Sequence, residues 1–204
     1  SRLWENHVGR SLAYWKNNFT VLQSFFPNKL KNINYKMFYE ACNNVKSSLI
    51  RTNSDELTYH IHILIRYEIE RELIEGSINV DELPSKWNSL YKKYLGVDVP
   101  SDSLGVLQDV HWSHGSFGYF PTYTIGSFYA AQFYNQASNE IPNIESKMEN
   151  GNTHELLLWL REKIHKHGKR YDANDLCKMI TGEELNFKHF MNYAINKYSK
   201  IYDI

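Results

Sequence analysis

The chain has 204 residues, of which 42% are hydrophobic and 23% charged, so it can bury a sizeable core and has a globular composition. Lys and Arg number 23, as do Asp and Glu, and this zero net charge lacks the basic surplus of nucleic-acid-binding proteins. No apolar run approaches the roughly 18 residues of a membrane span, and the two cysteines, Cys42 and Cys177, match no metal or redox spacing. We therefore expect a cytoplasmic protein with reduced thiols and with neither a nucleic-acid nor a membrane partner.

Amphipathic helices are predicted for the start of the chain. Apolar residues recur every three to five positions from Leu3 to Leu22, which indicates one or two helices ended by Pro27. The stretch INYKMFYEACNNVK, residues 33–46, is typical of a further helix.

Residues 48–76 contain two competing periods. Every second residue over 57–65 is apolar, as in a strand, but the uninterrupted length and the continuation of the segment favour a helix. We expect one long, largely buried helix that begins at a capping box of Asn53 and Glu56 and ends at Gly76.

The rest of the chain predicts helices around an irregular segment. Apolar spacing indicates a short helix over 80–95, further helices over 125–141 and 154–168, and a terminal helix within 182–204. Glycine, proline and polar residues interrupt any period over 98–125. The predicted fold class is mainly α, a multi-helix lobe with an irregular active-site loop, which leaves room for a minor β element.

Polar and aromatic residues in that loop are candidates for chemistry. His111 and His114 could bind a metal, exchange protons or donate to an oxyanion, although two histidines without a third ligand are a weak metal signal. Asp109 could orient an imidazole or cap a turn. Tyr119 and Tyr123 could donate hydrogen bonds to a charged intermediate, and packing is the alternative role for both.

Basic residues upstream of the loop offer a second kind of site. Arg51, just before a predicted helix, can present its planar fork to a carboxylate, or it forms a surface ion pair with Asp55. Arg66 lies among the glutamates of the long helix and is expected to pair with them. His60 and His62 lie roughly 200° apart on that helix, so they cannot share a metal. The residues alone predict a helical protein with a polar cleft built by the loop.

Three stretches together resemble one family. GVLQDVHW at 105–112 fits the motif G-x-x-Q-D-x-H-W, and IRTNSD at 50–55 fits I-R-x-x-A-D except that Ser54 replaces Ala. SRLWEN at 1–6 is similar to the sequence that follows the motif H-E-[SG]-Q. The chain thus resembles, over essentially its whole length, the HExxH zinc metallocarboxypeptidases typified by the thermostable carboxypeptidase Taq.

The resemblance implies a mostly helical enzyme with a deep cleft, usually homodimeric, that releases C-terminal residues from peptides with broad specificity, generally sparing proline. Its zinc, for which cobalt is an alternative in the cell, is bound by the histidines of HExxH and the glutamate of H-E-[SG]-Q. No HExxH occurs in this chain. The resemblance therefore implies that residues 1–204 are the C-terminal part of a single catalytic domain, inactive in isolation and with no metal of its own.

The resemblance also implies roles for individual residues. Arg51 would hold the terminal carboxylate of the substrate, because a guanidinium can bind a carboxylate through two parallel hydrogen bonds. The implied substrate-binding residues are Arg51, Asp55, Gln108 and Asp109, the last two as supports of the loop. The residues that would stabilise the tetrahedral intermediate are Tyr123 and His111, with Tyr119 and His114 as second choices.

Two other functions remain open at this point. The chain could be a stand-alone, non-catalytic protein that keeps the cleft and binds peptides or partners. It could also be a separate metal-binding protein that uses His111 and His114. A fragment of the carboxypeptidase should instead expose apolar surface and bind itself or the missing N-terminal part of the same enzyme.

Overall fold

In a computed structural model, which describes residues 1–204, the chain folds into two compact helical units. Unit 1 comprises Ser1–Asn43 and Gly126–Ile204, and unit 2 comprises Asn44–Ile125. The predicted mainly α class is confirmed, whereas the minor β element is absent because the alternating residues 57–65 lie in helical structure. No helix combines the length and the apolar character that crossing a membrane requires.

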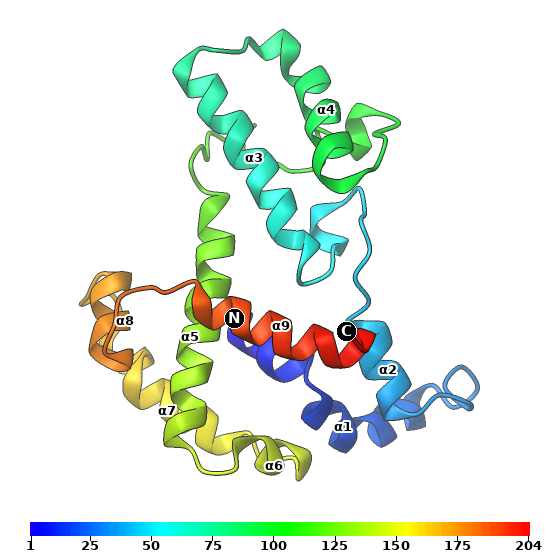
Figure 1. The fold of residues 1–204 in the computed structure, drawn as a ribbon, viewed down its shortest axis with the longest axis vertical. Helices are drawn as coiled ribbons and strands as arrows, with labels where there is room; N and C mark the ends of the chain where they lie inside the picture. Colours follow the sequence, from blue (N-terminus) through cyan, green and yellow to red (C-terminus); the bar gives the residue numbers. More distant parts are fainter. The chain divides into compact units, whose positions relative to one another are not determined.

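Unit 1 contains two helical elements before Pro27, where one or two were predicted, and the C-terminal helices (Figure 1). Its core is formed by buried apolar residues such as Leu3, Ala137, Met148 and Trp159. The elements are a π-helix at Leu3–Gly9, α1 (Leu12–Phe25), α2 (Tyr35–Cys42), α5 (Pro121–Glu140) from Gly126 onward, α6 (Ile144–Glu149), α7 (His154–Lys163), α8 (Ala173–Thr181) and α9 (Lys188–Tyr202).

Unit 2 is built on α3 (Thr58–Glu75) and α4 (Leu83–Leu95), which run side by side (Figure 1). Ile65 and Ile69 of α3 pack with Trp87 and Tyr91 of α4, and each of the four is at most 1% exposed. Both helices end at a glycine in the left-handed conformation, where a residue without Cβ is unstrained. Short 3-10 helices lie at Arg51–Asn53, Val80–Glu82 and Asp102–Leu104.

The start of α3 differs from the expected capping box. Asn53 lies in a 3-10 turn, and Asp55 takes over its role. One Asp55 oxygen accepts from the backbone N–H groups of Leu57 and Thr58, both at 2.9 Å, and the other accepts from the Thr58 hydroxyl. Asp55 thereby satisfies donors that the first turn of a helix leaves free. The predicted end at Gly76 is confirmed.

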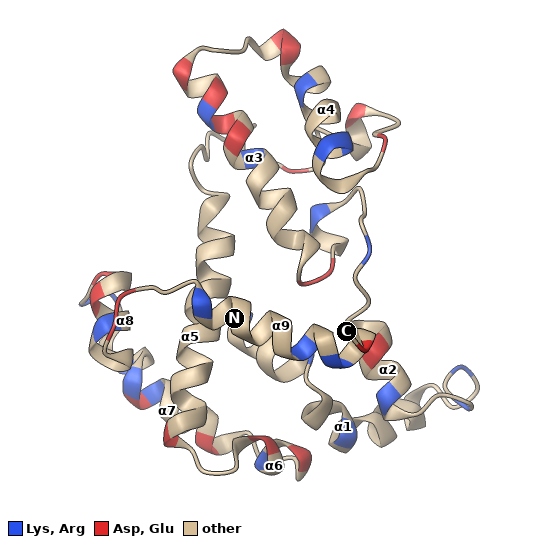
Figure 2. Ribbon diagram, viewed as in Figure 1, with Lys and Arg blue, Asp and Glu red and all other residues tan.

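Charged residues of both signs lie in each unit, mixed on helices such as α3 and α7, whereas α4 and α9 carry only lysines (Figure 2). Several opposite charges pair at short range, for example Lys86 with Glu72 and Lys147 with Glu155. This mixing agrees with the zero net charge of the sequence.

Candidate functional site

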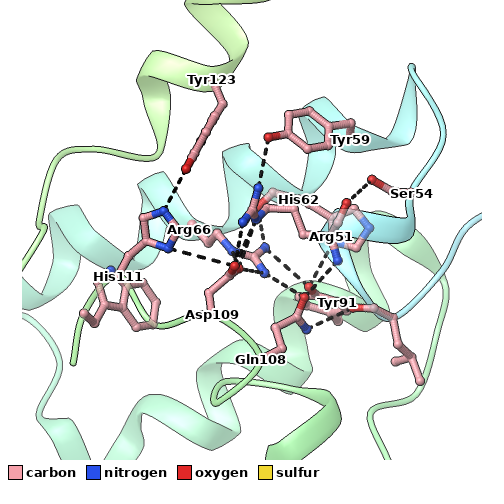
Figure 3. A network of polar contacts seen from close by, with 12 residues as sticks. Arg51, Ser54, Tyr59, His62, Arg66, Tyr91, Gln108, Asp109, His111 and Tyr123 are labelled. Carbon is pink, nitrogen blue, oxygen red and sulfur yellow. Dashed lines mark hydrogen bonds and ion pairs between the residues drawn. The ribbon is translucent and has the colours of Figure 1, made fainter. Parts of the chain in front are cut away.

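Asp109 is the centre of a polar cluster in unit 2 (Figure 3). The Nε and Nη2 atoms of Arg51 donate to its carboxylate at 3.0 and 2.6 Å. Nε of Arg66 donates to it at 2.8 Å, and Nη2 of Arg66 forms an ion pair with it at 2.7 Å. The Arg66 side chain is fully buried, and those of Arg51 and Asp109 are 7% and 10% exposed. One carboxylate thus neutralises one of two guanidiniums, and these three side chains carry a net charge of about +1.

The electrostatics of the cluster keep Asp109 ionised. Burial acts to raise the pKa of Asp109, but the hydrogen bonds and charges of Arg51 and Arg66 outweigh burial and lower the pKa. The expected roles of Asp109 in orienting an imidazole or capping a turn are not what the structure shows. The nearest imidazole nitrogen, Nδ1 of His111, lies 3.9 Å from the carboxylate and has no hydrogen-bond partner.

Gln108 joins the segments that build the cluster. Its Oε1 accepts from the backbone N–H of Arg51 and from Nη2 of Arg66, both at 2.9 Å. Its Nε2 donates to the carbonyl oxygens of Leu49 and Leu104. A single amide therefore links the segment before α3, α3 itself and the loop.

Arg51 does not form the expected surface ion pair with Asp55, because it is buried and pairs with Asp109 instead. Its Nη1 donates to the Tyr59 hydroxyl at 3.0 Å, and its guanidinium carbon lies 5.0 Å from the centre of the Tyr123 ring. The edge that pairs with carboxylates, formed by Nε and Nη2, is occupied by Asp109. Ser54, the departure from the family motif, is buried and donates to the Arg51 carbonyl at 2.6 Å.

His111 and Tyr123 form a second polar contact beside the cluster (Figure 3). Nε2 of His111 lies 3.0 Å from the Tyr123 hydroxyl. Tyr123 was expected in the irregular loop, but it lies in the first turn of α5, which begins at Pro121 because proline suits the first helical position. Burial lowers the pKa of His111 and raises that of Tyr123, so both groups are neutral at pH 7 and can donate hydrogen bonds.

The second-choice residues are more exposed. His114 donates to or accepts from the Ser116 hydroxyl, and its ring centre lies 6.0 Å from that of His111. Tyr119 is 50% exposed and meets the Tyr123 ring edge-on at 5.4 Å. The loop thus brings all four candidates of the catalytic set into one neighbourhood.

These residues do not fit a metal ion. No group of three or more His, Cys, Asp or Glu side chains in residues 1–204 is arranged to hold one. The carboxylate of Asp109, 3.9 Å from Nδ1 of His111, is already bonded to two arginines.

Sequence reasoning missed three residues that hold the site together. Arg66 was expected to pair with the glutamates of its own helix, but it reaches Asp109 and Gln108. Tyr59 and Glu70 of α3 contact Arg51 and the loop, respectively. The apolar period of α3 gave no signal of these contacts, and the partners of Arg66 and Glu70 lie more than 40 residues away along the chain.

The glycines of the loop take conformations or close approaches that other residues would not tolerate. Gly115 and Gly118 have positive φ angles of 81° and 77°. At Gly105 an added Cβ would lie 2.7 Å from Cγ1 of Val99, so only glycine fits the close approach there.

A cavity of about 440 Å³ lies elsewhere, in unit 1. His7, Tyr134, Tyr193 and Lys197 are among its lining residues, and none of the predicted site residues is. The His7 ring stacks on that of Tyr134 and meets that of Tyr193 at a tilt of 45°. Burial together with the Lys197 charge lowers the pKa of His7 to about 3. The polar cluster and this cavity are therefore separate features.

Comparison with known proteins places these features in a family context. The family model of carboxypeptidase Taq (M32) metallopeptidases matches residues 1–198. Carboxypeptidase 1 of Bacillus subtilis is 43% identical over 202 residues, which are 99% of this chain and 40% of that protein. Thermostable carboxypeptidase 1 of Pyrococcus furiosus is 38% identical over 198 residues, 97% of this chain and 40% of that protein.

A solved structure agrees with the sequence matches. The M32 carboxypeptidase from Deinococcus radiodurans R1 superposes with a TM-score of 0.96 at 40% identity, over 100% of this chain and 41% of that one. The chain therefore spans about 40% of the length of the curated relatives that it matches.

Proposed function

We propose, from the premise that this chain belongs to the carboxypeptidase Taq (M32) metallopeptidase family, that it is part of a metal-dependent carboxypeptidase releasing C-terminal amino acids from peptides with broad specificity. The observation that carries the proposal is the positively charged Arg51–Asp109–Arg66 cluster beside the neutral His111–Tyr123 pair. A carboxypeptidase must bind the free carboxylate of its substrate and stabilise an oxyanion nearby, and these two sets of donors suit those two tasks.

In this proposal Arg51 attracts the substrate carboxylate. Asp109 fills one edge of the guanidinium, so the carboxylate would approach Nη1, on the side of Tyr59 and Tyr123. The excess charge of the cluster supplies the attraction, and the low exposure of Arg51 strengthens it compared with a surface pair. Asp55 serves this site indirectly, by fixing the start of α3.

His111 and Tyr123 would donate to the oxygen of the scissile carbonyl as negative charge develops on it. Both are neutral near pH 7, and each keeps an N–H or O–H group with which it can donate. His111 and Tyr123 bond to each other at 3.0 Å, so a substrate oxygen would take the place of that contact.

The description of the family implies a metal, for which we propose zinc. Residues 1–204 offer no fitting ligand set, so its ligands would lie in the remainder of the protein. We further propose a homodimeric, cytoplasmic enzyme. Free thiols at Cys42 and Cys177 support the location, and exposed apolar residues such as Phe25 and Leu107 provide surface that contact with the remainder of the protein or with a second copy would cover.

The test is steady-state kinetics of the complete enzyme on an N-blocked dipeptide and on its C-terminal amide. Tyr123→Phe and His111→Ala should each lower kcat by roughly 10²-fold or more, because each removes an oxyanion donor. Tyr94→Phe, which removes a phenol bonded to Glu68 away from the site, is the matched control and should leave kcat unchanged. The amide should be a poor substrate, and Arg51→Met should raise KM for the free acid.

Two results would contradict the proposal. If kcat survives both site substitutions, the pair has no role in oxyanion stabilisation. If the complete protein binds peptides without cleaving them, it is a binding protein that retains the cleft.

A further inference from the structure

Glu70 is a buried carboxylate with an unusual set of partners. It lies on α3 one turn after Arg66 and is 5% exposed. One oxygen accepts from the indole N–H of Trp112 at 2.8 Å, and the other accepts from the backbone N–H of Gly118 at 3.2 Å. No Lys, Arg or His pairs with it in residues 1–204, so its charge is met by neutral donors from the loop alone.

Keeping a carboxylate in this place is costly. Burial raises the pKa of Glu70, and the hydrogen bonds from Trp112 and Gly118 only partly oppose that effect. A buried apolar side chain would avoid the cost, since a lone buried charge is destabilising. The carboxylate therefore contributes to the structure through its two hydrogen bonds to the loop.

The loop is attached to α3 at two successive turns. Arg66 holds Asp109, and Glu70, four residues later, holds Trp112. His111 lies between these two attachment points along the chain. Its backbone is thus fixed on both sides, which determines where its ring can meet Tyr123.

We infer that Glu70 is a positioning residue of the site: its carboxylate fixes both ends of segment 112–118 and thereby holds His111 against Tyr123. The inference rests on the proposed function for the importance of that pair, but its physical content concerns the place of the His111 ring. The expected consequence is that loss of the Glu70 acceptors releases the ring toward solvent.

The His111 ring can report this displacement. Burial lowers its pKa, and the charges of Asp109, Arg51, His114 and Arg66 also act on it. Trp112→Phe breaks the contact with the loop but keeps the Glu70 charge, so a change of the His111 pKa in that variant reports a movement of the ring and not the loss of a neighbouring charge.

The experiment is an NMR titration of the histidine rings, with the Trp112 indole N–H as a second signal, in the 204-residue chain. Glu70→Gln keeps the size of the side chain, but its single carbonyl oxygen cannot accept from both donors while its NH₂ group faces one of them. We expect the Trp112 indole signal to move, the His111 pKa to rise toward about 6.5, and the contact between the His111 and Tyr123 rings to weaken. The matched control is Glu72→Gln, which removes a carboxylate bonded to Lys86 on the same helix.

Trp112→Phe gives the same test with Glu70 intact, by removing the indole donor and keeping an aromatic ring in the core. The Trp112→Phe variant therefore tests the inference even where the Glu70→Gln variant does not fold. An unchanged His111 titration in a folded variant whose Trp112 contact is lost would overturn the inference. The proposed function is judged separately, because a failure of Tyr123→Phe to affect kcat would leave the NMR result untouched.

Discussion

Replacing Asp109 with Asn should be the most damaging single change in unit 2. Asn is the same size, but it offers one acceptor oxygen where Asp109 accepts N–H groups from two guanidiniums at 2.6–3.0 Å. Arg66 is fully buried, so water cannot replace the lost partner. Removing one side of a buried ion pair costs about 3–5 kcal/mol. Because two cations lose their partner here, we expect a loss of at least about 3 kcal/mol, a large part of a typical domain stability of about 5–15 kcal/mol.

The assay is urea unfolding followed by tryptophan fluorescence, since Trp87 and Trp112 lie in unit 2. Asp98→Asn is the control, because Asp98 is 84% exposed and pairs with Lys92 at the surface, where ion pairs contribute little. The double variant Asp109→Asn/Arg51→Met should lose less than the sum of the single losses, since the two side chains share one interaction. A loss below about 1 kcal/mol in Asp109→Asn would refute the reasoning, because it would mean that the guanidiniums need no buried counter-charge.

Three further predictions concern pH and backbone fit. The pKa of Asp109 is lower in the folded than in the unfolded chain, where it is about 3.9, so the ionised carboxylate stabilises the fold above that pH. This contribution should disappear as pH falls through the folded pKa. In Asp109→Asn, the unfolding free energy should therefore depend less on pH in this acid range. Burial and the charges of Arg66 and Arg51 lower the pKa of His62 to about 3, so His62 stays neutral in the folded protein. Acidification from pH 7 to 5 should lower the free energy of unfolding by about 2 kcal/mol, because only the unfolded chain takes up the proton. An NMR titration of His62 near pH 6.5 in the folded protein would contradict this. Gly105→Ala should destabilise the fold by about 1–3 kcal/mol, because the added Cβ clashes with Val99. Gly126→Ala should stabilise the fold by about 0.5–1 kcal/mol, because Gly126 lies in α5 with open space around it. Thermal unfolding of the two variants tests both predictions.

Long periodic segments were predictable from the sequence, whereas only some of the short ones were: α2, with eight residues, was predicted, and α6 and α8 were not. The apolar spacing of the long helix α3 and the glycine that ends it sufficed against a competing strand period. Helices α6 and α8, with six and nine residues, were not predicted, because so few residues complete barely two turns of a pattern. Their formation depends on packing within unit 1, where Ile144 and Met148 of α6 and Ile180 of α8 are buried.

Local motifs identified the residues of the site but not their partners. Asn53 and Glu56 have the spacing of a capping box, yet Asp55 lies where the backbone donors of the first turn can reach it. Arg51 has an acidic residue four positions ahead, yet it pairs with one 58 residues away. A reading of the sequence favours partners that are close along the chain. In the folded protein, buried polar groups need hydrogen-bond partners, and Asp109 accepts from several N–H groups of Arg51 and Arg66.

The pairing of Arg51 with Asp109 changes what the arginine can do for a substrate. A buried guanidinium without a counter-charge would destabilise the free protein strongly, and it would hold any carboxylate, including that of a released amino acid, with the full strength of a buried ion pair. Asp109 offsets most of that cost before substrate arrives and also fixes the orientation of the fork. Because Arg66 adds a second positive charge to the same carboxylate, the cluster still attracts an anion. If Arg51 binds the substrate carboxylate as proposed, Asp109 and Arg66 together would leave a pre-oriented site whose attraction is moderate enough to release a product carboxylate, which a lone buried arginine could not provide.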